Sequence, residues 1–190
     1  KNITQINISN EEESKNFFIL TDTEVLPDLD EYDLIIGLSL INFLEDIPSF
    51  LKQLKNILTK DGLLLTSFFS ENNILELKDL FSRVELNIYE GISQRFMPII
   101  DIREVGDLIN NIGFFDTVIT REKLEYKYEN FNEMVSHLRL MAYTNFLDVK
   151  NNKFITKRFI NSLVNDFEKN KTNSLFKLSF DILIINSWNK

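Results

Sequence analysis

The chain has 190 residues, of which 44% are hydrophobic, a composition typical of a globular domain that buries a sizeable core. Its formal net charge of −8 disfavours binding to nucleic acid or to an anionic membrane surface. Cysteine is absent, which excludes disulfides, thiolate catalysis and cysteine-ligated zinc. The longest apolar run, residues 34–44, is too short to span a bilayer, and we expect no membrane insertion. Because no signal peptide is recognisable at Lys1, we expect a location in the cytoplasm, or in an organelle matrix after removal of a transit peptide.

Strand-like and helical patterns alternate in the first half of the chain. The strand patterns lie at residues 3–8, 17–20, 34–38 and 63–69. The apolar run 34–38 is typical of a parallel strand that is covered on both faces. A helix is predicted over residues 48–58, and the Asp61-Gly62 pair should end it before the next strand begins. We expect strands 17–20, 34–38 and 63–69 to run parallel.

Helical patterns dominate the second half before a final strand. Apolar residues at helical spacing cover residues 73–87, 102–112, 131–143 and 156–167. Gly113 follows the second of these helices and is typical of a helix C-cap. Residues 115–128 form either two strands or one long strand, and residues 176–187 form a largely buried strand that we expect to be antiparallel. The alternation predicts a doubly wound α/β sheet in a single domain spanning residues 1–190.

Residues at two predicted strand ends are candidates for ligand binding. Asp22 and Thr23 follow strand 17–20, at the carboxyl end where open α/β sheets bind ligands. The alternative is a turn aspartate that caps the next segment. Gly37 and Leu38 end strand 34–38, where a small residue lets a ligand approach the backbone. The alternative there is a simple bend from strand to loop.

Two arginines are candidates for substrate binding. Arg95 and Arg103 lie with Asp101 in a polar stretch, and arginine suits bidentate binding of a carboxylate. The alternative is an internal bond, from Asp101 to Arg103 or to the backbone, that shapes the loop. The only histidine, His137, is more typical of a surface or capping residue than of a catalyst. No catalytic residue is assigned, and the acidic residues 11–13 are more typical of a solvated helix turn than of a metal site.

Several segments carry a resemblance to a known family. Residues 20–27, 32–40 and 54–62 are similar to the middle of a class I S-adenosylmethionine (SAM)-dependent methyltransferase. Residues 95–114 and 138–145 narrow the resemblance to one branch of that family. The branch contains the biotin-pathway methyltransferase and the mitochondrial complex I assembly factor of methyltransferase type.

The resemblance implies a Rossmann-like sheet that binds SAM across the carboxyl ends of its strands. Asp22 and Thr23 would match the turn that contacts adenine, and Gly37 and Leu38 would lie beside the methionine part. The family's first strand and glycine-rich motif are not found in the 190 residues, and Asn7 stands where the family has an acidic ribose-binding residue. We therefore expect weak or absent SAM binding by this chain.

Three functions stay open on these grounds. The first is methyl transfer to a small acid, an acyl carrier or a protein, once the N-terminal part of the fold completes the chain. The second is a non-catalytic assembly factor for respiratory complex I, and the third is arginine modification of a complex I subunit. The resemblance places the protein in the mitochondrial matrix if its source is eukaryotic. Because strand 34–38 would be an apolar edge without the family's first strand, we also expect a homodimer.

Overall fold

The computed structural model describes residues 5–7, 17–19, 25–26, 31–38, 44, 46–93, 95–96, 101–141 and 156–190, with the backbone alone for 5–7 and 17–19. The chain divides into two compact units. Unit 1 comprises Lys1–Phe68, Asp101–Thr120 and Leu183–Lys190, and unit 2 comprises Phe69–Ile100 and Arg121–Ile182. Three strands contribute residues to both units, so the expectation of a single domain stays a prediction.

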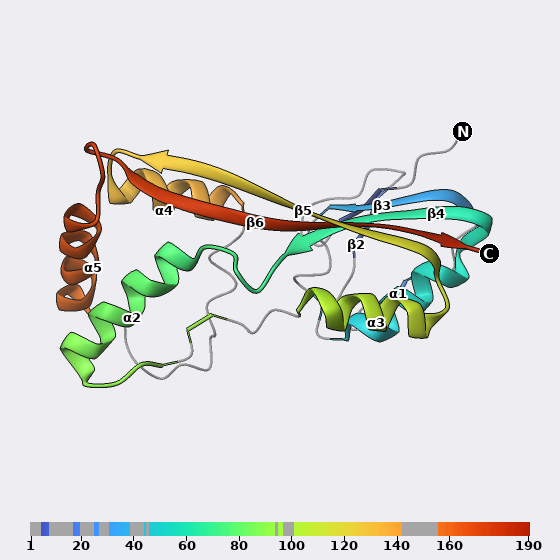
Figure 1. Cartoon of the computed structure of the whole chain (residues 1–190), viewed down its shortest axis with the longest axis horizontal. Helices are drawn as coiled ribbons and strands as arrows, with labels where there is room; N and C mark the ends of the chain where they lie inside the picture. Colours follow the sequence, from blue (N-terminus) through green and yellow to red (C-terminus); the bar gives the residue numbers. More distant parts are fainter. Residues whose placement is uncertain are drawn as a thin grey trace. The chain divides into compact units, whose positions relative to one another are not determined.

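The fold is mixed α/β, as the sequence predicts (Figure 1). The strands are β1 (Gln5–Asn7), β2 (Phe17–Ile19), β3 (Tyr32–Leu38), β4 (Leu58–Phe69), β5 (Phe115–Tyr128) and β6 (Phe176–Asn189). The helices are α1 (Ile47–Asn56), α2 (Leu75–Tyr89), α3 (Ile102–Ile112), α4 (Phe131–Leu140) and α5 (Lys157–Lys169). In the described part of the chain, no helix is both long enough and apolar enough to cross a membrane.

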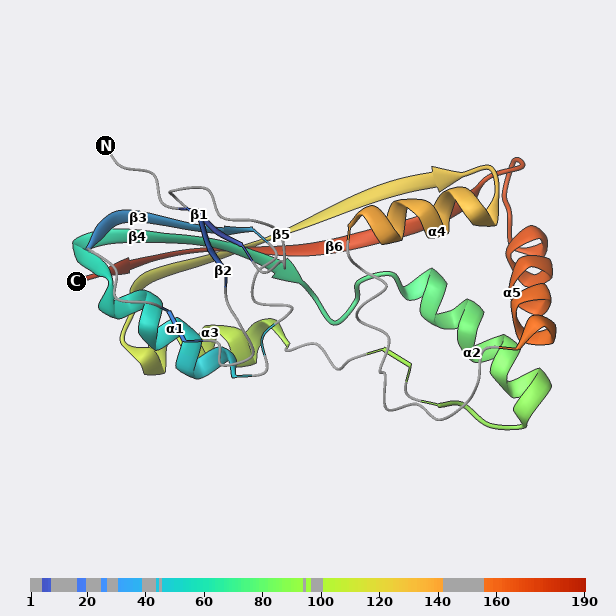
Figure 2. The same cartoon turned by 180° about the vertical axis from the view of Figure 1, so that it is seen from behind.

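The described strands form two sheets. One has four strands in the order β3-β4-β6-β5, and the other is the short pair β1-β2, visible from behind in Figure 2. β3 runs parallel to β4, which confirms the expected parallel arrangement of strands 34–38 and 63–69. β2 pairs parallel with β1 in the separate two-stranded sheet, so the expected direction of strand 17–20 relative to β3 and β4 stays a prediction. The arrow of β6 points opposite to those of β4 and β5, so the final strand is antiparallel as expected (Figure 1).

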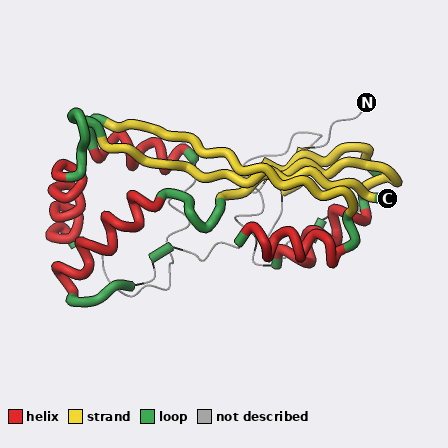
Figure 3. Tube along the Cα trace, in the orientation of Figure 1, coloured by secondary structure: helices red, strands yellow, loops and turns green. Residues whose placement is uncertain are grey.

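Capping residues mark three helix ends in unit 1: the start of α1 and both ends of α3. In α1, the Asp46 carboxylate accepts a hydrogen bond from the Ser49 backbone N–H at 3.0 Å. α3 begins with a capping box between Asp101 and Glu104, and ends at Gly113, whose φ of +90° is left-handed. Both helices lie on the same side of the strands of unit 1 (Figure 3). The prediction of Gly113 as a C-cap is confirmed.

The Asp61-Gly62 pair does not end α1, contrary to the prediction. α1 ends at Asn56, and both residues lie within β4. Tyr32 pairs with Leu58 but Leu34 pairs with Leu63, so β4 carries extra residues in a bulge. A Cβ on Gly62 would lie 2.9 Å from the Thr59 carbonyl oxygen, which explains a glycine at this bend. The turn-forming residues therefore serve a bulge rather than a helix end.

β3 is not covered on both faces, which corrects a second prediction. The side chains of Leu34, Ile36 and Leu38 are 49%, 56% and 74% exposed. Leu34 and Ile36 pair with Leu63 and Leu65 of β4, so these residues share one face of the sheet. No helix of the described residues covers that face. An apolar run shows that a strand favours burial, but it does not supply the element that buries it.

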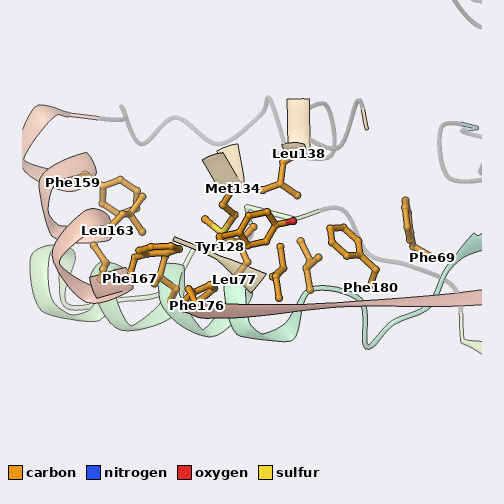
Figure 4. Close-up of a cluster of buried hydrophobic side chains, with 14 residues drawn as sticks. Phe69, Leu77, Tyr128, Met134, Leu138, Phe159, Leu163, Phe167, Phe176 and Phe180 are labelled. Atoms are coloured by element: carbon orange, nitrogen blue, oxygen red, sulfur yellow. The ribbon is translucent and has the colours of Figure 1, made fainter. Parts of the chain in front are cut away.

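Unit 2 has its own aromatic core (Figure 4). Helices α2, α4 and α5 and the adjacent parts of β5 and β6 bury Phe69, Ile74, Leu77, Leu80, Val84, Tyr128, Met134, Leu138, Phe159, Leu163, Phe167, Phe176, Leu178 and Phe180. The rings of Phe167 and Phe176 stack with their centroids 4.5 Å apart. All three predicted helices form, although α4 ends at Leu140 rather than at residue 143.

Candidate functional site

The carboxyl end of β3 holds the two predicted cofactor-binding residues that the structure describes. Gly37 is buried, and its carbonyl oxygen accepts a hydrogen bond from the Thr66 hydroxyl at 2.8 Å. Leu38 pairs with Ser67 and leaves its side chain largely exposed. The other two predicted residues, Asp22 and Thr23, lie outside the described residues, so their role stays a prediction.

SAM combines an adenine ring, ribose hydroxyls and a charged methionine end. Leu38 offers an exposed apolar contact that fits an uncharged part of this molecule, whereas Gly37 is buried, has no side chain to obstruct a ligand and has its carbonyl oxygen bonded to Thr66. Neither side chain carries a charge, so the amino, carboxylate and hydroxyl groups would need partners elsewhere in the protein. The described end of β3 thus fits part of the cofactor and does not by itself hold its charged end.

Arg95 lies within a buried ion pair. Its side chain is 6% exposed, and its Nε donates to the Glu85 carboxylate at 2.6 Å. The Ser93 backbone N–H and hydroxyl also donate to that carboxylate. Burial tends to raise the pKa of Glu85, but the bonds from Ser93 and Arg95 outweigh it and hold the pKa below its ordinary value. Glu85 therefore stays ionised opposite Arg95.

The Arg95 guanidinium also packs against an aromatic ring. Its central carbon lies 4.7 Å from the centroid of the Phe159 ring, a cation–π contact. Its Nη2 is buried and has no hydrogen-bond partner within the described part of the chain. These contacts give Arg95 a structural role in unit 2, and its assignment to substrate binding stays a prediction.

Arg103 is exposed in the first turn of α3, in unit 1. Its backbone N–H donates to the Asp101 carboxylate at 2.7 Å, which is the internal bond considered as the alternative from the sequence. Asp101 is thus a helix cap. The Arg103 side chain stays a substrate-binding prediction that the geometry leaves open.

A second ion pair in unit 2 was not predicted from the sequence. Arg121 of β5 binds the carboxylate of Asp181 of β6, and Asp181 is only 4% exposed. Ser70, directly after β4, donates its hydroxyl proton to the same carboxylate at 2.6 Å. The bond from Arg121 lowers the pKa of Asp181 against the opposing effect of burial. One sequence signal was available, because Asp181 is an acid inside an otherwise apolar strand and such an acid needs a buried partner.

His137 forms part of an aromatic cluster in unit 2. The Tyr128 hydroxyl and His137 Nδ1 lie 2.6 Å apart, and the rings of Tyr126 and Phe180 lie 4.8 Å and 6.0 Å from the imidazole centroid. Burial raises the pKa of Tyr128 to about 12. These contacts give the histidine a packing role, which differs from the surface or capping role expected from the sequence. The described acidic residues and His137 form no group of three that could hold a metal ion.

Sequence comparison relates the chain to curated proteins of two kinds. It is 24% identical over 158 residues to arginine-hydroxylase NDUFAF5 of Dictyostelium discoideum, which covers 82% of this chain and 36% of that protein. It is 26% identical over 163 residues to "Putative methyltransferase RP459" of Rickettsia prowazekii, covering 83% and 71%. It is 21% identical over 171 residues to malonyl-[acyl-carrier protein] O-methyltransferase of Gallionella capsiferriformans, covering 90% and 57%.

The matches have a limited extent. The chain spans 36% of the Dictyostelium NDUFAF5 protein and 40% of the human one, less than half of either. No protein-family model matches the chain.

Two solved structures share the fold. A "putative methyltransferase" from Bacillus halodurans matches with a TM-score of 0.51 and 11% identity over 93% of this chain and 73% of that chain. The YcgJ protein from Bacillus subtilis matches with a TM-score of 0.52 and 10% identity over 93% and 72%. The expected resemblance is therefore confirmed: the chain is a homologue of NDUFAF5 and of malonyl-[acyl-carrier protein] O-methyltransferase, with the Rossmann-like fold of class I SAM-dependent methyltransferases.

Proposed function

We propose that this chain is the cofactor- and substrate-binding part of a SAM-dependent methyltransferase-like protein. The observation that carries the proposal is the parallel β3-β4 pair, with buried Gly37 at the carboxyl end of β3. The acceptor would be a small acid, an acyl carrier or a protein, and the name of one relative, malonyl-[acyl-carrier protein] O-methyltransferase, supports the acyl carrier. The protein would act in the cytoplasm, or in the mitochondrial matrix if its source is eukaryotic.

Binding and orientation would be the chain's contribution to such a reaction. When bound, SAM supplies an electrophilic methyl group. Gly37 would admit the cofactor close to the backbone and Leu38 would exclude water from one side of it, while Asp22 and Thr23 would hold the adenine. Positioning of this kind supplies much of the rate enhancement for a direct displacement, so a strong general base is not required for a carboxylate acceptor.

A titration of the 190-residue chain with SAM and with S-adenosylhomocysteine tests the cofactor site. We expect weak binding or none by calorimetry, and concentration-dependent shifts of the Gly37 and Leu38 amide signals in NMR spectra at millimolar ligand. Leu38→Asp should reduce the shifts, whereas Leu86→Asp, an exposed leucine on α2, should not. Unchanged Gly37 and Leu38 signals throughout the titration would remove these residues from the site. A low-micromolar dissociation constant would instead show that the chain already holds the charged end of the cofactor, and Asp22→Ala should then weaken binding.

A second candidate function is supported by the relatives named as arginine-hydroxylases, which are mitochondrial proteins. Under it, the chain would serve complex I assembly, either as a non-catalytic binding factor or through arginine modification. The two candidates differ in one measurement. Transfer of a labelled methyl group from SAM to an acyl-carrier or acid acceptor favours the first, and capture of an arginine-containing peptide without methyl transfer favours the second.

A further inference from the structure

The Arg121 guanidinium binds Asp181 through one edge of its planar fork. Its Nε lies 2.9 Å and 3.0 Å from the two carboxylate oxygens of Asp181, and its Nη2 also donates to that carboxylate. This is a side-on, bidentate pair. A guanidinium has a second edge, formed by Nη1 and Nη2, that can bind another oxyanion end-on.

Asp181 is fixed so that it holds Arg121 in one orientation. It is buried, and Ser70, itself 0% exposed, donates its hydroxyl proton to the carboxylate at 2.6 Å. The backbone N–H of Asp181 donates to the side-chain oxygen of Asn73, also 0% exposed, at 2.9 Å. Burying a carboxylate is costly unless it is fully bonded, and these contacts meet that need. The guanidinium is therefore held in place before any ligand arrives.

The second edge of Arg121 is exposed at Nη1 and only weakly engaged at Nη2. Its side chain is 42% exposed, and Nη1 makes no hydrogen bond within the part of the chain that the structure describes. Nη2 donates to the Ser70 hydroxyl oxygen at 3.4 Å and to the Glu71 carboxylate at 3.5 Å, both long contacts, so a ligand at this edge would compete with Glu71. We propose that this edge of Arg121, just beyond the carboxyl end of β4, is a binding site for a carboxylate-bearing ligand. The inference does not rest on cofactor binding.

The surrounding charges favour a monoanionic carboxylate over a phosphate. Lys123 acts electrostatically on Asp181, and the Lys78 ammonium bonds to the Glu71 carbonyl oxygen at 3.0 Å. With Arg121 these lysines slightly outnumber the carboxylates of Glu71 and Asp181. Because the excess is a single positive charge, one carboxylate neutralises it, whereas a phosphate group, which carries close to two charges at neutral pH, leaves a net negative charge beside Glu71.

Two other arginines of unit 2 each lack a property that this site requires, which is either exposure to solvent or a buried partner that fixes the guanidinium. Arg95 is similarly paired through Nε, but it is buried against Phe159 and closed to solvent. Arg83 pairs through Nε with Asp166 at 2.9 Å and is 43% exposed, close to the exposure of Arg121. Its partner Asp166 is 21% exposed and accepts one other side-chain hydrogen bond, from Asn170 at 3.3 Å. Asp181, by contrast, is nearly fully buried and is bonded by the buried Ser70. Arg83 is therefore a matched control for an exposed arginine that is not pre-oriented.

Titration of the 190-residue chain with sodium acetate, at ionic strength held constant with chloride, tests the site by NMR. We expect saturable shifts of the Arg121 side-chain signals and of the Ser70 and Glu71 amides. Inorganic phosphate at equal ionic strength should bind at least about threefold more weakly. Equal or tighter binding of phosphate would overturn the assignment to a carboxylate, and linear, non-saturating shifts would overturn the site.

Two variants and one control separate a specific site from a general charge effect. Arg121→Lys keeps a cation beside Asp181 but loses the fork, so saturable acetate binding should disappear while the spectrum stays folded. Glu71→Gln removes the nearest competing carboxylate, so acetate should bind about threefold more tightly. Arg83→Gln should leave binding unchanged. An Arg121→Lys variant that still binds acetate as the wild type does would refute the proposal, and this result would be independent of any outcome with SAM.

Discussion

The two units differ in how they treat charge and apolar surface. In the described residues, the buried charged side chains Glu85, Arg95 and Asp181 all belong to unit 2, where each has a partner of opposite sign. Unit 1 buries polar side chains of Thr66, Ser67 and Ser187 but no charged one among those described. Conversely, unit 1 leaves the apolar face of β3 exposed.

The comparison shows that buried charges are paired in unit 2, whereas apolar strand residues stay exposed in unit 1. Unit 2 encloses an aromatic core, and the charged side chains buried in its described part are paired within the unit. Unit 1 has a strand, β3, whose leucines and isoleucine favour burial but are exposed, and no helix of its described residues covers them. We infer that β3 of unit 1 needs a partner surface outside its described residues, whereas the core of unit 2 does not. The experiments below test this difference in descending order of expected effect.

Glu85→Ala should lower the free energy of unfolding most. Removing this carboxylate leaves the buried Arg95 cation without its counter-charge, at a cost of about 3–5 kcal/mol. Chemical denaturation followed by circular dichroism measures the change. Arg83→Gln, at an exposed ion pair, should cost less than about 1 kcal/mol. Equal costs for the two variants would mean that unit 2 does not depend on its buried pair.

A pair of leucine truncations in strands compares the units directly. Leu178 on β6 is 0% exposed in the core of unit 2, whereas Leu38 on β3 is 74% exposed. Leu178→Ala should cost about 2–5 kcal/mol and Leu38→Ala less than about 0.5 kcal/mol by the same denaturation measurement. A large cost at Leu38 would show that its side chain is covered in solution.

Self-association through β3 would extend the described four-stranded sheet at its outer strand, which belongs to unit 1. We propose an antiparallel pair of β3 strands across a two-fold axis, because β3 ends the order of the described four-stranded sheet. Light scattering at micromolar concentration should then give about twice the 22.4 kDa mass of the chain. Ile36→Lys should return the mass to that of a monomer, and Ile160→Lys on α5 should not. A wild-type monomer would count against the dimer.

The sequence predicted elements well where local chemistry decides them. α3 has the bounds that its pattern predicts, because Asp101 and Gly113 cap it from neighbouring positions. The cover of β3 was mispredicted because apolar residues within a strand carry no information on which element packs over them.

Contacts between residues far apart in the sequence could not be predicted from local patterns. Arg121 and Asp181 are 60 positions apart, and only the strand order brings them together. For the candidate site, the sequence identified Gly37 at a strand end, whereas Asp22 and Thr23 stay predictions. Arg95 and Arg103 were grouped by proximity in sequence, but the structure assigns them to different units.

The smallest expected effect concerns alkaline pH. Burial raises the pKa of Tyr128 from about 10 in the unfolded chain to about 12 in the folded one. The neutral phenol therefore contributes stability that is complete below about pH 10 and is lost as pH rises through about 12. Tyr128→Phe should flatten this loss when unfolding is measured across the range. Trp188 is the only tryptophan and belongs to unit 1, so its fluorescence reports whether unit 1 unfolds over the same pH range. An unaltered alkaline profile in the variant would rule Tyr128 out as the titrating group.

The course of β6 has a consequence for biosynthesis. This strand lies between β4 and β5 in the sheet, supplies Phe176–Ile182 to unit 2 and continues as Leu183–Lys190 in unit 1. Ribosomes deliver the chain from its N-terminus at about 5–20 residues per second, so β4 and β5 emerge without the strand that separates them. Two strands with open edges must therefore avoid premature pairing until β6 has been made. A nascent chain halted before residue 176 should bind chaperones that shield exposed strands, and release should coincide with completion of β6.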